Sequence, residues 1–74
     1  MKIRARLFAT LREGRGREVE TDLPEGSTVM DLIGALRIPE KDVAILLVNG
    51  RDGRLSGVLG EADTVSIFPP VGGG

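Results

Sequence analysis

The stretch Thr28-Val29-Met30-Asp31-Leu32-Ile33-Gly34-Ala35-Leu36, residues 28–36, predicts a single amphipathic helix. Its apolar residues recur at i, i+3, i+4 and i+7 and so share one side of a helix: Val29, Leu32, Ile33 and Leu36. Thr28 is the expected N-cap, and Asp31 provides a weak form of the capping box. Gly34 is expected to let the helix approach a sheet closely, and Pro39 ends the pattern. Such a helix needs a sheet to cover.

The chain before the helix is predicted to form a β-hairpin. Residues 2–10 and 17–23 alternate in the way that half-buried strands do, and Gly14 and Gly16 mark the turn between them. In the first strand, the expected core-facing residues are Ile3, Ala5, Leu7 and Ala9. The expected outward-facing residues are Arg4, Arg6 and Phe8.

The chain after the helix is predicted to supply further strands. Residues 43–48 form a continuous apolar run, which is typical of a strand buried on both sides or nearly so. Asn49-Gly50 predicts a tight turn directly after this run. Residues 64–68 form the last strand, with Val65 and Ile67 facing inward.

This order of elements predicts an α+β fold of the β-grasp, or ubiquitin-like, type. One main helix packs across a mixed sheet of four or five strands, because a lone helix must cover one face of a single sheet. The crossover through the helix makes two strands parallel neighbours. These are the first and last strands, so Phe8 and Phe68 are expected to lie close together. The expected boundaries are a β-grasp domain over residues 1–68 and an extended tail over residues 69–74.

The composition excludes several classes of function. The 74 residues contain no cysteine, histidine, tyrosine or tryptophan, so disulfides, thiolate zinc sites and the usual catalytic base and nucleophile are unavailable. We therefore expect no metal site and no enzyme activity from the chain alone. A net charge of −1 argues against nucleic acid as a partner. The absence of a signal sequence and of a long apolar run predicts a cytoplasmic protein without a membrane partner.

The final residues, Phe68-Pro69-Pro70-Val71-Gly72-Gly73-Gly74, have a composition suited to an extended probe. Proline holds the chain extended, and glycine lacks the Cβ that would block entry to a narrow channel. The residues after Phe68 reach up to roughly 20 Å. A frayed terminus is the simpler alternative, but a Pro-Pro spacer is an unusual way to build one. The carboxyl group of Gly74 is the group expected to undergo covalent chemistry.

Several motifs resemble those of the MoaD/ThiS family of ubiquitin-like sulfur carriers. They are Ile3-Arg4-Ala5-Arg6-Leu7-Phe8-Ala9-Thr10-Leu11-Arg12-Glu13, Ser27-Thr28-Val29, Val48-Asn49-Gly50 and the terminal stretch from Phe68 to Gly74. The terminal stretch is similar to the Phe-Pro-Pro-Val-x-Gly-Gly ending of the small subunit of molybdopterin synthase. The resemblance covers the whole chain. One departure is Ala62, where the family usually has a turn glycine, so that turn can differ in geometry with no functional consequence expected.

The resemblance implies a chemistry that the partners catalyse. A ubiquitin-activating-enzyme-like adenylyltransferase would use ATP to adenylate Gly74, and the acyl-adenylate would become a thiocarboxylate. The tail would then enter the larger subunit of molybdopterin synthase and donate sulfur. Gly73 and Gly74 are the expected reacting end, and no cofactor is expected to be bound. The expected partner-binding residues are Phe8, Arg12, Phe68, Pro69, Pro70, Val71 and Gly72; for Arg12, a solvated surface charge is the alternative.

Three alternative functions remain open on the sequence. One is a carrier in the thiamine pathway, against which the Phe-Pro-Pro-Val stretch argues. Another is a protein modifier joined through Gly74 to lysines of other proteins. The last is a plain binding domain, in which the basic N-terminal strand docks an acidic protein or RNA.

Overall fold

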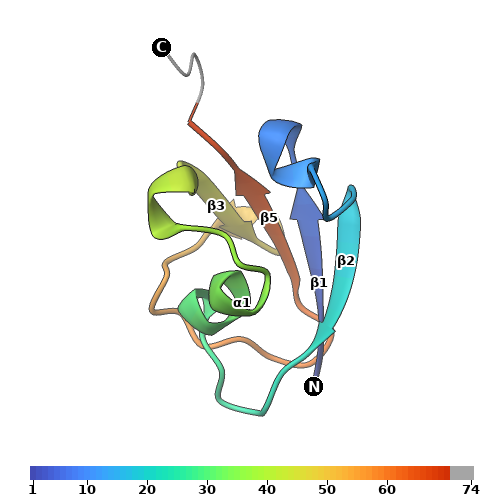
Figure 1. The fold of residues 1–74 in the computed structure, drawn as a ribbon. Coiled ribbons are helices and arrows are strands. Elements are labelled where there is room, and N and C mark those ends of the chain that lie inside the picture. Colours follow the sequence, from blue (N-terminus) through green and yellow to red (C-terminus); the bar gives the residue numbers. More distant parts are fainter. Residues whose placement is uncertain (71–74) are drawn as a thin grey trace.

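The computed structural model describes residues 1–70, which form one sheet with a helix across one of its faces (Figure 1). The elements in chain order are β1 (Lys2–Leu7), η1 (Ala9–Arg12), β2 (Glu18–Asp22), α1 (Val29–Ala35), η2 (Glu40–Asp42), β3 (Ile45–Val48), β4 (Arg51–Asp52) and β5 (Thr64–Phe68), where η denotes a 3₁₀ helix. The strand order is β2-β1-β5-β3-β4. β1 and β5 are parallel, and every other pair is antiparallel. The predicted β-grasp fold is confirmed, with five strands.

The core lies between α1 and the sheet face that α1 covers. The buried apolar residues are Ile3, Ala5, Leu7, Leu11, Val29, Leu32, Ile33, Ile38, Leu46, Leu59, Val65 and Ile67. The alternation predicted for the first and last strands is confirmed for Ile3, Val65 and Ile67, all of which are fully buried. Leu36 is only half-buried, because it is the residue at which α1 ends.

The N-terminus of α1 is capped as the sequence predicts. The Thr28 hydroxyl accepts a hydrogen bond from the Asp31 N–H at 3.3 Å, and the Asp31 carboxylate accepts one from the Thr28 N–H at 2.9 Å. The next two N–H groups donate to the carbonyl oxygens of Gly57 and Leu55 in the loop before β5. The loop thereby satisfies donors that a helix start leaves without internal partners.

The predictions for residues 43–48 and for Ala9 were wrong in part. The strand begins only at Ile45, which is 51% exposed, and Leu46 is the one member of the run that is buried. The reason is that α1 covers one face of β3 and leaves the other open. Ala9 leaves the strand pattern altogether: it adopts a left-handed φ of 52°, begins η1 and is exposed.

The structure also shows the backbone geometry of two turns and the surroundings of one glycine in α1. Asn49 and Gly50 have φ values of 53° and 82°, which are those of the two-residue hairpin turn predicted between β3 and β4. Ala62 keeps a left-handed φ of 68°, as a glycine would, and its N–H donates to the Lys2 carbonyl oxygen. Gly34 does not approach the sheet, since a Cβ placed on it would meet nothing within 4 Å.

Candidate functional site

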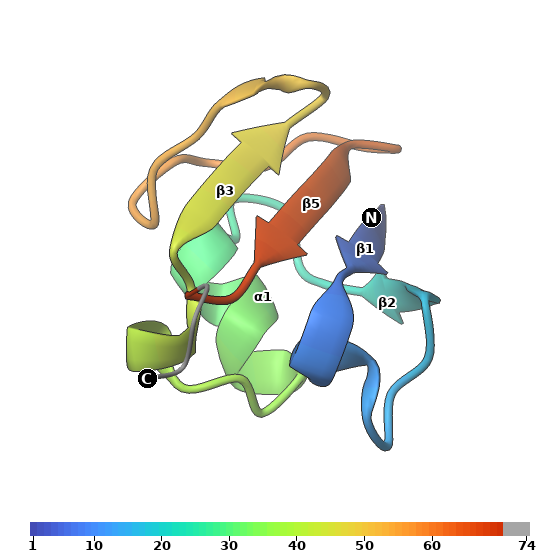
Figure 2. The same ribbon diagram turned by 90° about the horizontal axis from the view of Figure 1, so that it is seen from above.

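The candidate site is the root of the C-terminal tail, where β5 ends at Phe68. The chain leaves the sheet at the end of the molecule where η1 and η2 also lie, as the views from the side and from above show (Figures 1 and 2). The Phe68 carbonyl oxygen accepts a hydrogen bond from the Ala44 N–H at 2.8 Å, which holds the end of β5 to the start of β3. Pro69 is half-buried against this end, and Pro70 is exposed.

The expected closeness of Phe8 and Phe68 is confirmed. Their ring centroids are 4.1 Å apart, and the ring planes differ by 11°, so the rings are stacked. The parallel register pairs Leu7, the last residue of β1, with Ile67, and so brings the residues that follow them, Phe8 and Phe68, side by side. Both rings are half-buried and neither belongs to the core cluster under α1. Such a pair contributes about 0.5–1.5 kcal/mol beyond its buried area.

Arg12 extends this stack on the η1 side. Its guanidinium carbon lies 5.4 Å from the centroid of the Phe8 ring, within the range of a cation–π contact. Its Nε donates to the Leu7 carbonyl oxygen at 2.9 Å. This bond uses one of the five N–H donors of an arginine. Arg12 is therefore held in place over the aromatic pair and is half-buried, not a fully solvated charge.

Sequence reasoning missed two apolar residues on the same face. In the register of β3 and β5, Ile45 is paired with Phe68, and Leu47 is paired with Ser66. Cross-strand partners have side chains on the same side of a sheet, so Ile45 and Leu47 lie on the face that carries Phe68. The Asn49-Gly50 turn could have indicated their exposure. A two-residue turn pairs the apolar run with the short strand that follows, and this places the run next to the edge of the sheet. We call the set Phe8, Phe68, Ile45 and Leu47 the outer patch.

The two arginines of β1 face outward as expected, but they have different neighbours. Arg4 pairs with β2: its Nε lies 3.0 Å from the Glu18 carboxylate, and its Nη2 lies 3.9 Å from that of Glu20. Exposed ion pairs of this kind contribute about 0–1 kcal/mol. Arg6, two residues before Phe8, remains on the outer face beside Ser66 of β5. The outer patch therefore has one β1 arginine next to it, together with Arg12.

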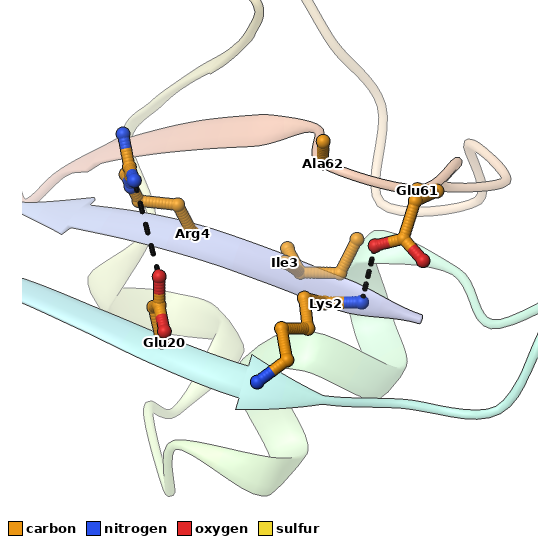
Figure 3. A pocket seen from close by; sticks show the side chains of 6 residues that line it. All are labelled: Lys2, Ile3, Arg4, Glu20, Glu61 and Ala62. Atoms are coloured by element: carbon orange, nitrogen blue, oxygen red, sulfur yellow. Dashed lines mark hydrogen bonds and ion pairs between the residues drawn. The ribbon is translucent and has the colours of Figure 1, made fainter.

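A depression at the opposite end of β1 is separate from the tail root (Figure 3). It is lined by Lys2, Ile3, Arg4, Glu20, Glu61 and Ala62. The Lys2 N–H donates to the Glu61 carboxylate at 2.7 Å, which ties the turn before β5 to the first strand. Asn49 and Asp63 reinforce the same corner with a side-chain hydrogen bond of 2.9 Å. These contacts hold the strand ends together and bring no reactive group to the depression.

The remaining expected site residues lie outside residues 1–70. They are Val71, Gly72, Gly73 and Gly74, so their roles stay predictions, as does the division at residue 68 into domain and tail. Within residues 1–70, no group of three or more carboxylate, histidine or cysteine side chains is placed to hold a metal ion. The helices of this part are too short or too polar to span a bilayer.

Comparison with solved structures gives matches over nearly the whole chain. A putative molybdopterin converting factor, subunit 1, from Pyrococcus furiosus is 32% identical with a TM-score of 0.81, and the match covers 96% of this chain and 99% of that one. The small archaeal modifier protein 1 from Haloferax volcanii is 27% identical with a TM-score of 0.82, over 95% and 98% of the two chains. A chain of the complex of subunits 1 and 2 of the molybdopterin-converting factor from Helicobacter pylori is 21% identical, with a TM-score of 0.68 over both full chains, and supports the fold alone.

Comparison with sequences gives one family. No curated protein sequence matches the chain. The model of the ThiS family matches residues 5–74, which include both phenylalanines of the aromatic stack and the whole tail. The chain therefore belongs to the ThiS family.

Proposed function

We propose that this chain is a sulfur carrier for molybdopterin biosynthesis, with Gly74 as the group that carries the sulfur. The observation that supports this proposal most is the stacked pair of Phe8 and Phe68 at the root of a Pro-Pro-Val-Gly-Gly-Gly tail. A partner that binds this pair would contact the chain directly beside the segment that must enter an active site. The match to a putative molybdopterin converting factor subunit supports the choice of pathway.

The proposed chemistry takes place in two steps at the carboxyl group of Gly74. In the first step, a carboxylate oxygen attacks the α-phosphate of ATP on the activating enzyme, which forms the acyl-adenylate and releases pyrophosphate. In the second, a hydrosulfide ion from the sulfur source attacks the carbonyl carbon; the new C–S bond forms as the bond from that carbon to the phosphate oxygen breaks, AMP leaves, and loss of the thiol proton gives the thiocarboxylate. In this proposal the chain contributes the carboxyl group of Gly74 as the reacting group, and the activating enzyme supplies the catalytic groups for both steps.

The outer patch is the proposed docking surface for both the activating enzyme and the larger subunit of molybdopterin synthase. Aromatic and arginine side chains contribute most of the binding energy at many interfaces. Here an aromatic pair lies beside Arg12, with the half-exposed Ile45 next to it in the sheet. Because one surface serves both partners, the two complexes would form one after the other and not together.

A reconstituted transfer reaction tests the pathway. The chain is first loaded with sulfur and then mixed with the larger subunit of a molybdopterin synthase and the pterin precursor. We expect formation of the dithiolene product and regeneration of the carboxylate. A thiazole synthase replaces the larger subunit in a parallel reaction. Sulfur transfer only in this second reaction would assign the chain to the thiamine pathway and contradict the proposal.

A protein modifier is the second candidate, because the chain also matches small archaeal modifier proteins over nearly its full length. In that case, a lysine amine of a target protein would displace AMP and form an isopeptide bond with Gly74. Affinity isolation of the tagged chain from cells separates the candidates. Isopeptide-linked adducts would support the modifier, and a free thiocarboxylate supports the carrier.

A further inference from the structure

Two carbonyl groups directly after α1 receive no hydrogen bond from the helix itself. The Ile38 N–H donates to the Ile33 carbonyl oxygen at 2.9 Å, and the Arg37 N–H donates to that of Gly34 at 3.1 Å. These two bonds, with Arg37 at a left-handed φ of 59°, form the Schellman ending of a helix. The carbonyl groups of Leu36 and Arg37 lie beyond this motif and are not satisfied by it.

Arg15 supplies the donors, although it belongs to the loop between β1 and β2. Its Nε donates to the Leu36 carbonyl oxygen at 3.0 Å, and its Nη2 donates to that of Arg37 at 2.9 Å. Its Nη1 donates to the Leu11 carbonyl oxygen in η1 at 3.1 Å. All three guanidinium nitrogens are thus engaged with backbone oxygens from two separate elements. A lysine ammonium cannot reproduce this planar, divergent set of donors.

The hydrogen bond from Arg15 to η1 connects Arg15 with the residues at the tail root. Leu11 is 4% exposed and anchors η1 in the core. The next residue, Arg12, lies over the Phe8 ring, and that ring stacks on Phe68. The geometry points to Arg15 as a positioning residue that sets the place of η1, and through Arg12 the place of the Phe8 ring against Phe68.

The backbone conformation of Ala9 explains why η1 is held by hydrogen bonds from outside. Ala9, between Phe8 and the rest of η1, has a left-handed φ of 52°, a conformation that is unfavourable for a residue with a Cβ. A strained residue keeps its conformation only where its surroundings hold it there. Arg15 holds the far side of η1 to α1, while the Leu7–Arg12 hydrogen bond holds the near side to β1. The consequence for docking depends on the proposed function, but the position of the rings does not.

The ring position can be measured without any partner. Phe8 and Phe68 are the only aromatic side chains of the chain, so the aromatic proton region of its NMR spectrum reports on this pair alone. A Phe8→Leu variant leaves one ring and gives the unstacked reference shifts of Phe68. In Arg15→Ala we expect the Phe68 ring signals to move at least halfway toward that reference, while the methyl signals of Leu32 and Val65 stay in place. Arg15→Lys should show the same change in weaker form.

A matched control and a kinetic measurement complete the test. Arg17→Ala removes an exposed arginine from the same loop and should leave the ring signals unchanged. With an activating enzyme, Arg15→Ala should raise the KM for the carrier about tenfold and leave kcat unchanged, the pattern of a binding defect.

Ring signals of a folded Arg15→Ala at the wild-type positions would overturn the inference. Loss of folding in both Arg15 variants would also overturn it, because Arg15 would then support the whole fold and not the ring position. If the wild-type chain were not adenylated at all, the proposed function would fail, and the ring signals would still decide the role of Arg15.

Discussion

Replacing Phe68 with alanine should separate docking from folding. The Phe68 side chain is half-buried, and full burial of a phenylalanine contributes about 1.5–3 kcal/mol. Half of that, together with about 0.5–1.5 kcal/mol for the stack on Phe8, gives a loss of roughly 2 kcal/mol in the free energy of unfolding. The loss of binding to the activating enzyme and to the larger synthase subunit should be ~2 kcal/mol or more, a typical loss at an interface hot spot.

Leu32→Ala is the matched control, because Leu32 of α1 is fully buried in the core between the helix and the sheet and does not belong to the outer patch. It should lower the free energy of unfolding by about 2–5 kcal/mol, more than Phe68→Ala does. Its dissociation constants per folded molecule should equal those of the wild type. The free energy of unfolding is measured by urea unfolding. The dissociation constants are measured by titration calorimetry at a temperature where both variants are folded. The reasoning is refuted if Phe68→Ala binds like the wild type, or if both variants lose binding equally.

Other substitutions test separate parts of the account. Gly73→Val should leave the unfolding curve unchanged and abolish adenylation, because a side chain at that position would block threading; unchanged adenylation rates would contradict this. Ala62→Gly should raise the free energy of unfolding by up to about 1 kcal/mol, since a left-handed alanine costs about 1–2 kcal/mol and the flexibility of glycine offsets part of the gain. Gly34→Ala should also raise it by about 1 kcal/mol, because the new Cβ meets open space in an exposed helix position; urea unfolding that shows a loss for either variant would count against the described backbone.

The fold was predictable because its signals are local and agree with one another. The apolar stripe of α1, the Thr28 cap and the Asn49-Gly50 turn each depend on residues close in sequence, and each was confirmed. The closeness of Phe8 and Phe68 followed from alternation once the two strands were taken as parallel neighbours, whereas the stacking of the rings was seen only in the structure.

The errors arose where the outcome depends on what covers a residue. An apolar run looks the same whether one or both faces of its strand are covered, so the run by itself did not indicate the exposure of Ile45. Ala9 left the strand because the chain turns into η1 there, and alanine gives no sign of a left-handed conformation. The bonds of Arg15 join residues that are 21 and 22 positions apart, and one loop arginine among several in the sequence gives no hint of them.

The most direct test of the central claim is the intact mass of the chain after incubation with ATP, a sulfur source and a candidate activating enzyme. We predict a mass change that matches the exchange of one oxygen for one sulfur, dependent on ATP and located by fragmentation in the C-terminal peptide that ends at Gly74. An unchanged mass with every activating enzyme of the source cell, or a sulfur located on an internal residue, would contradict the account.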